Sequence, residues 1–265
     1  MPDHRNIDAQ ARNNAPKRQA QETAALTALA VVRDVARHLD PDLISTLHQA
    51  ALSADRNACS TALATALAKG VRREDIADFY IPEVARAMGD EWCADELGFA
   101  GVTIGVSRLQ SMLRDLGPDW SGDKSADPAA PSIMLLVPQE VYHTLGAMVL
   151  AGQLRRLGLS VRMMLGARPS EVAERIQRTK YDAVFISSSR GETLESLRRI
   201  VDVVKNATDQ PPPVVIGGSL LEVETTENVT ALTGADYATI RVYEALKHCG
   251  LTTTPLSSVS TMRRT

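Results

Sequence analysis

One histidine stands where it could bind a metal ion. His143 follows an apolar run at residues 133–137, which is typical of a buried β-strand, and precedes a helix-like segment at 147–154. Open α/β sheets bind their ligands where strand ends and helix N-termini meet in one crevice. A neutral imidazole is the commonest protein ligand for a transition metal. The other interpretation, that His143 only helps to cap the helix, has equal weight on position alone.

Two further loops contain residues that suit a large ligand. Ser187, Ser188 and Ser189 follow the apolar run 183–186, and the pair Gly217–Gly218 follows another at 214–216. Hydroxyl groups can hydrogen-bond the second nitrogen of a metal-bound imidazole. Paired glycines allow a large flat group, or its tail, to lie against the main chain. We therefore expect these loops to line one binding site together with His143.

The elements that must position these loops alternate between strands and helices. Several strands are almost entirely apolar, as a sheet buried on both faces requires. This pattern predicts a flavodoxin-like or Rossmann-like parallel sheet over residues 132–250. The expected strands are 133–137, 161–165, 183–186, 214–216 and 237–238, and the expected helices are 144–157, 170–178, 193–205, 221–225 and 242–249.

Residues 23–116 follow the helical period instead. Pro41 suits the first turn of one helix and Gly70 the end of another. Short connections between such helices predict antiparallel neighbours, hence a bundle of four or five helices. The expected order is a flexible tail at 1–22, the bundle at 23–116, a Pro- and Gly-rich linker at 117–131, the sheet domain, and a flexible tail at 251–265.

The composition excludes several classes of protein. The chain has 265 residues, 44% of them hydrophobic and 23% charged, as in soluble globular proteins. A net charge of −3 gives no reason to expect broad nucleic-acid binding. No apolar run approaches the roughly 18 residues that a membrane span needs, and the N-terminus has no signal-peptide core. Three cysteines without a CxxC pair favour the reducing cytoplasm.

The three loops resemble the motifs of cobalamin-binding domains, which carry Asp-x-His-x-x-Gly, then Ser-x-Leu, then Gly-Gly. Here they read Val141-Tyr142-His143-Thr144-Leu145-Gly146, Ser187-Ser188-Ser189 and Gly217-Gly218. Val141 departs from the Asp of the first motif, and Ser189 from the Leu of the second. The segment 82–92, which ends at Trp92, resembles the helical bundle that precedes the binding domain in corrinoid proteins.

This resemblance implies a hydroxo-, methyl- or adenosylcobalamin held between the bundle, as a corrinoid cap, and the sheet domain. His143 would be the lower axial ligand of the cobalt, and Trp92 would lie over the upper face of the corrin. The dimethylbenzimidazole tail would run toward Ser187 and the two glycines. The implied cofactor-binding residues are Trp92, Tyr142, His143, Thr144, Gly146, Ser187, Ser188, Ser189, Gly217 and Gly218. No catalytic residue is implied.

A narrower resemblance involves segments 99–110 and 143–156, which are similar to the AerR/PpaA family. Those proteins regulate photosynthesis genes in purple bacteria through a partner repressor, and they respond to light or oxygen through a bound tetrapyrrole. The resemblance implies a non-enzymatic antirepressor whose partner is a DNA-binding repressor. Photoreceptor relatives carry Trp-x9-Glu-His, but Val102 and Thr103 stand at that spacing from Trp92. The upper axial histidine of those relatives is therefore missing.

Three other functions stay open at this point. A corrinoid methyl carrier uses the same two domains, but it would usually need the carboxylate that Val141 replaces. A haem-based redox sensor is possible because histidine also ligates iron. Direct DNA binding rests on residues 68–76, which loosely resemble a helix-turn-helix junction. An ordinary turn between bundle helices is the favoured interpretation of that segment, because such matches are common by chance.

Overall fold

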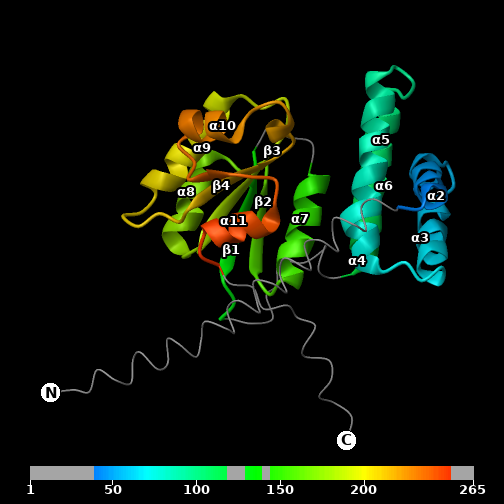
Figure 1. The fold of residues 1–265 in the computed structure, drawn as a ribbon, viewed down its shortest axis with the longest axis horizontal. Helices are drawn as coiled ribbons and strands as arrows, with labels where there is room; N and C mark the ends of the chain where they lie inside the picture. Colours follow the sequence, from blue (N-terminus) through cyan, green and yellow to red (C-terminus); the bar gives the residue numbers. More distant parts are fainter. Residues whose placement is uncertain (1–38, 118–128, 139–143, 252–265) are drawn as a thin grey trace, which may run out of the picture.

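The computed structural model describes residues 39–117, 129–138 and 144–251, which form a helical bundle beside an α/β unit (Figure 1). Most of the expected linker, the expected N-terminal tail, residues 23–38 of the expected bundle and all but Leu251 of the expected C-terminal tail lie outside these residues. Within the described ranges, no helix is both long and apolar enough to cross a lipid bilayer.

The bundle forms around one apolar core. As expected, Pro41 lies in the first turn of its helix, and Asp40 caps that turn by accepting a hydrogen bond from the Asp42 amide at 3.0 Å. Gly70, with φ of +84°, follows the end of the next helix. The helices are α2 (Pro41–Leu52), α3 (Ala58–Ala68), α4 (Arg73–Asp75), a π-helical turn η1 (Ile76–Tyr80), α5 (Ile81–Cys93) and α6 (Phe99–Leu116).

The α/β unit contains the parallel sheet that the sequence predicts. Its five strands lie in the order β2-β1-β3-β4-β5, so the chain reverses direction across the sheet between β1 and β3. The strands are β1 (Ser132–Val137), β2 (Ser160–Leu165), β3 (Ala183–Ser188), β4 (Val214–Gly218) and β5 (Tyr237–Ala238). The helices are α7 (Leu145–Arg156), α8 (Pro169–Arg178), α9 (Leu194–Asn206), α10 (Thr226–Thr233) and α11 (Val242–His248).

Helices cover both faces of the sheet. Successive strand residues point to opposite faces, so Phe185 and Val215 face α7 and α11, whereas Ile186 and Ile216 face α8, α9 and α10. Burial of both faces explains why the strands are apolar throughout rather than alternating with polar residues.

One expected helix is wrong. Residues 221–225 do not form a helix of their own: the first two belong to the short 3-10 turn η3 (Ser219–Glu222), and α10 begins only at Thr226. The Thr225 hydroxyl accepts a hydrogen bond from the Asn228 amide and so fixes the start of α10. The sequence of α10 lacks a clear apolar stripe, so the helical period of the sequence does not reveal this helix.

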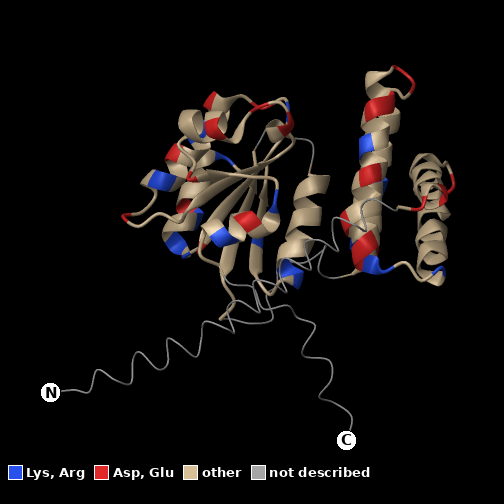
Figure 2. Ribbon diagram, viewed as in Figure 1, with Lys and Arg blue, Asp and Glu red and all other residues tan. Residues whose placement is uncertain are grey.

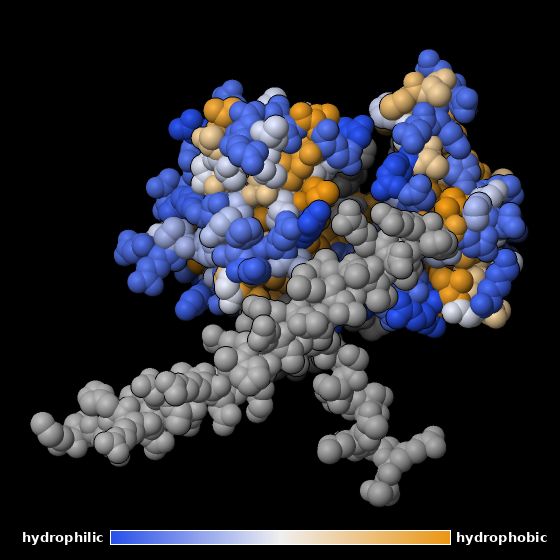
Figure 3. Space-filling view, in the orientation of Figure 1, coloured by the Kyte–Doolittle hydropathy of each residue, from blue (hydrophilic) through white to orange (hydrophobic). Residues whose placement is uncertain are grey.

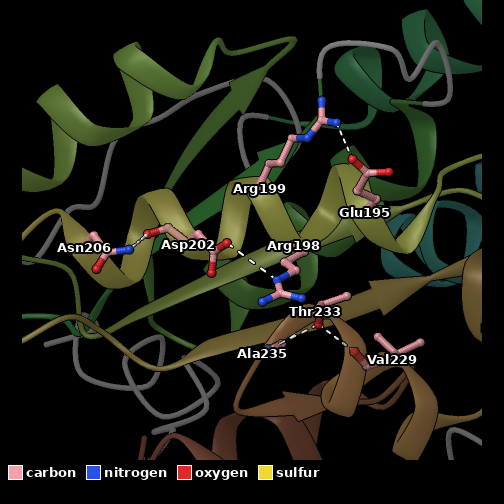
Figure 4. Close-up of polar contacts among 8 residues, drawn as sticks. All are labelled: Glu195, Arg198, Arg199, Asp202, Asn206, Val229, Thr233 and Ala235. Atoms are coloured by element: carbon pink, nitrogen blue, oxygen red, sulfur yellow. Dashed lines mark hydrogen bonds and ion pairs between the residues drawn. The ribbon is translucent and has the colours of Figure 1, made fainter.

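Local polar contacts stabilise the end of α10 and the solvent face of α9 (Figure 4). The buried Thr233 hydroxyl donates to the Val229 carbonyl at 2.6 Å and accepts from the Ala235 amide at 3.2 Å, which closes the end of α10. The solvent face of α9 carries ion pairs one turn apart, such as Glu195 with Arg199. These charges stay in water while Leu197, Val201 and Val204 pack on the sheet.

Helix α7 joins the two units. Its residues Leu145, Met148 and Val149 belong to the same apolar cluster as the bundle core. Two polar contacts accompany this packing: Gln110 of α6 donates to the Thr144 hydroxyl at 2.8 Å, and Arg156 pairs with Asp78 at 2.5 Å. The bundle is therefore docked on the α/β unit through α7.

Candidate functional site

A cavity of about 190 Å³ opens at the carboxyl edge of the sheet. It lies between the sheet face formed by β3 and β4 and the two helices α7 and α11. Its walls are almost entirely apolar and include Leu150, Phe185, Val215, Val242 and Ala245. Pockets that enclose a whole drug-sized ligand have roughly 300–1,000 Å³. The cavity therefore suits one apolar arm of a larger ligand rather than the whole of it.

The two glycines at the end of β4 line this cavity, but the fold itself also requires them. Gly218 has φ of +110°, and a β-carbon there would lie 2.1 Å from the Ser188 carbonyl oxygen. A β-carbon on Gly217 would lie 2.8 Å from the carbonyl oxygen of Thr239. The sequence suggested that these glycines allow a flat ligand to approach the main chain. The structure gives a second reason for glycine at both positions, because neighbouring main chain also approaches them closely.

Gly146 differs from these two glycines. It lies in the first turn of α7 and lines the cavity, yet a β-carbon there would meet no atom within 4 Å. The fold does not require glycine at this position. Its missing side chain instead leaves space beside the cavity.

The structure separates the three serines. Ser187 lines the cavity. Ser188 points to the opposite face of β3, where its buried hydroxyl donates to the Gly217 carbonyl at 2.8 Å. Ser189 follows the strand, and its amide donates to Glu192 at 2.9 Å. Of the three, only Ser187 contributes to the cavity wall, although the sequence groups them in one loop.

The loop after β1 is described only at its ends. Thr144, directly before α7, accepts the hydrogen bond from Gln110. Tyr142 and His143 lie outside the described residues, and so does Glu140. Metal ligation by His143 therefore stays a prediction. In the described part of the chain, no three His, Cys, Asp or Glu side chains come together as a metal site.

Trp92 lies in the last turn of α5, the helix that ends at Cys93. Trp92 is 46% exposed, and a β-carbon on Gly89 would meet no atom within 4 Å. The predicted position of Trp92 over a bound cofactor therefore stays a prediction.

Two acidic residues near strand termini, Asp182 and Asp236, have structural roles. The Asp182 carboxylate accepts a hydrogen bond from the Ser132 amide at the start of β1, and Asp236 accepts one from the Val214 amide at the start of β4, both at 2.7 Å. Both acids lie at the amino edge of the sheet, opposite the cavity. They join neighbouring strands and are not available for chemistry at the carboxyl edge.

The two histidines that the structure describes, His48 and His248, also have structural partners. His48 pairs with Glu91 at 3.0 Å, and the His248 ring stacks on Tyr237 with 4.2 Å between centroids. His4 and His38 lie outside the described residues.

Several residues at the site were missed by sequence reasoning. Thr239, Val242 and Ala245 line the cavity from β5 and α11, and Gln110 reaches Thr144 from the bundle. A single Gln on a helix carries no sequence signal for a contact between domains. The cavity-lining role of α11 could have been inferred, because this sheet order places the first and last helices on the same face.

Comparison with known proteins agrees with this geometry. The family model for the B12 binding domain matches residues 131–246. An uncharacterized 20.5 kDa protein from the bchF-crtJ intergenic region of Rhodobacter capsulatus is 36% identical over 166 residues. The match covers 63% of this chain and 85% of that protein.

The fold itself is similar to a solved structure. The monomethylamine corrinoid protein of Methanosarcina barkeri superposes with a TM-score of 0.58 at 17% sequence identity. The match covers 78% of this chain and 94% of that one. At this level of identity the likeness concerns the fold, which in both chains extends beyond the sheet domain.

Proposed function

The chain belongs to the AerR/PpaA type of cobalamin-binding-domain proteins, and on that premise we propose that it is a cobalamin-dependent sensor that regulates photosynthesis genes through a partner repressor. The observation that carries the proposal is the apolar cavity between α7 and α11, walled by glycines of two motifs. Its position is the crevice where sheets of this type bind their ligands.

The residues of the cavity fit the tail of cobalamin. An aromatic dimethylbenzimidazole would fill an apolar slot of this size, with the Ser187 hydroxyl and the main chain of Gly217 and Gly218 as its neighbours. His143 would hold the cobalt from below, and Trp92 would cover the corrin from the bundle side. Bound cobalamin would supply a cobalt ion whose upper ligand light or a change of oxidation state can exchange.

The cavity wall favours a binding role over catalysis. In the described part of the chain, no Asp, Glu, His, Lys or Cys lines it. General acid–base catalysis needs a titratable group within hydrogen-bonding reach of the reacting atom. Val141 also lacks the carboxylate that a methyl carrier would usually need next to its axial histidine. The protein's own groups therefore suit retention of the cofactor and response to its state.

The surface of the bundle favours a protein partner over direct contact with DNA. Asp and Glu outnumber Lys and Arg in residues 39–117, and acidic residues are distributed along α5 and at its tip (Figure 2). In the turn that resembles a helix-turn-helix junction, Arg72 pairs with Asp75, and Arg73 donates to the Leu116 carbonyl. These arginines already have partners within the protein, so a repressor would carry the DNA contact.

The test is an absorption spectrum of the protein after incubation with hydroxocobalamin and desalting. His143→Ala is measured beside it, and haemin is offered to a parallel sample. Retained cobalamin with a spectrum altered by His143→Ala supports the sensor, and repressor binding in light and in darkness then tests its output. Retention of haemin alone would replace the proposed cobalamin-dependent sensor with a haem redox sensor. Retention of neither cofactor would refute tetrapyrrole binding.

A further inference from the structure

Helix α7 belongs to two cores at once. Leu145 and Met148 pack with the bundle, whereas Ala147, Ala151 and Leu154 on the other side of the helix pack against the sheet. The space-filling view shows apolar residues on the upper part of the α/β unit, on the side toward the bundle (Figure 3). Any change in the position of α7 must therefore alter packing on both sides.

The first turn of α7 is held by the bundle instead of by its own cap. Thr144 is the N-cap residue, a position where Thr usually accepts a hydrogen bond from an amide of the first turn. Its hydroxyl makes no such bond here. It accepts one from Nε2 of Gln110 on α6, at 2.8 Å.

The other end of α7 has a stronger attachment. Arg156 pairs with Asp78, and both side chains are largely buried. Hydrogen bonds between charged groups are about twice as strong as neutral ones. Of these two contacts with the bundle, the neutral bond between Gln110 and Thr144 is therefore the one that yields first. It lies at the same end of the helix as the cavity.

We propose that Gln110 is a positioning residue that couples the bundle to the cofactor site. Through the Thr144 hydroxyl it fixes the first turn of α7, where Gly146 forms part of the cavity wall. The identity of the ligand rests on the proposed function, but the coupling between Gln110 and α7 does not.

Hydrogen exchange in the cofactor-free protein tests the coupling by itself. The Met148 amide donates to the Thr144 carbonyl at 3.0 Å, so it reports opening of the first turn. In Gln110→Ala we expect this amide to exchange about fivefold faster, the order that loss of one neutral hydrogen bond allows. Gln49→Ala is the matched control, because the exposed Gln49 side chain donates to Ser45 of its own helix at 3.2 Å. Unchanged exchange relative to this control would overturn the proposal.

Thr144 variants distinguish the hydrogen bond from packing. Thr144→Ser keeps the hydroxyl, so its Met148 amide should exchange at the wild-type rate. In Thr144→Val the same amide should exchange as fast as in Gln110→Ala. Combining Gln110→Ala with Thr144→Val should add nothing further, because both changes remove the same bond. Additive effects of the two substitutions would show that each acts separately and would refute the coupling.

Cobalamin then tests the consequence for the site. Gln110→Ala and Thr144→Val should release bound hydroxocobalamin several-fold faster than Gln49→Ala. Equal release rates in all three variants would refute the link to the cofactor site. If the wild type retains no cobalamin, the proposed function fails, and the exchange measurement still decides whether Gln110 positions α7.

Discussion

The carbonyl oxygen of Ser188 lies 2.1 Å from the point where a β-carbon on Gly218 would stand. The two residues are paired across β3 and β4, and Gly218 has φ of +110°. We expect Gly218→Ala to lower the free energy of unfolding by about 2–4 kcal/mol, because it adds backbone strain to overpacking. Urea denaturation of the cofactor-free protein measures this. A change below about 0.5 kcal/mol would show that the strand end adapts.

Gly146→Ala should have the opposite profile. The new methyl group would meet no protein atom within 4 Å, and alanine in a helix is more favourable than glycine by about 0.5–1 kcal/mol. We expect unchanged or higher thermal stability together with weaker retention of hydroxocobalamin, because the methyl group enters space beside the cavity. Retention equal to that of the wild type would mean that the cofactor does not come close to the first turn of α7.

The adjacent serines give a second matched pair. Ser187→Ala should leave the free energy of unfolding nearly unchanged while weakening cobalamin retention, because Ser187 faces the cavity. Ser188→Ala should cost about 1 kcal/mol, because the buried hydroxyl donates to the Gly217 carbonyl. Urea denaturation and gel filtration with cobalamin separate the two effects. The reverse assignment would mean that the cofactor lies on the other face of β3.

Trp92→Ala tests the predicted cap. The side chain is 46% exposed, so its removal should change the melting temperature of the cofactor-free protein only slightly. Cobalamin dissociation should become faster, because the indole is predicted to cover the corrin. Ile104→Ala, another half-exposed apolar residue of the bundle, is the control. If both variants release cobalamin at the wild-type rate, Trp92 does not contact the cofactor.

The sheet could be predicted from sequence because its strands are apolar on both faces, a pattern characteristic of parallel sheets covered by helices. The exact end of β3 could not be predicted from the sequence. Its hydrogen bonds continue through Ser188, whose partner in β4 is Gly218. The pleat therefore sends Ser187 and Ser188 to opposite faces, whereas the polar sequence alone is typical of a loop in which all the serines share one site. Their separation follows from strand pairing, which is not visible in the local sequence.

The contacts between the two units could not be predicted either. Gln110 and Asp78 are ordinary polar residues on helices, and their partners Thr144 and Arg156 follow 34 and 78 residues later in the chain. Such a pair is determined by how α7 packs against the bundle. Only the tertiary structure brings these side chains together, although the helices that carry them were expected.

The contact between Asp78 and Arg156 gives a prediction for pH. Burial raises the pKa of Asp78 above its ordinary value of 3.8, although Arg156 and Gln153 favour the ionised form. Between the ordinary pKa and the raised pKa of the folded protein, the folded protein keeps a proton that the unfolded chain has lost. The free energy of unfolding therefore falls as pH rises through this window. Asp78→Asn cannot titrate there. We expect the stability of the wild type relative to Asp78→Asn to be greatest below the window, and to decline to a plateau above it.

Urea denaturation of both cofactor-free proteins from about pH 3.5 to about pH 6 measures the difference, with Glu83→Gln as an exposed control. A relative stability that rises with pH would mean that the ion pair with Arg156 outweighs the cost of burying the carboxylate.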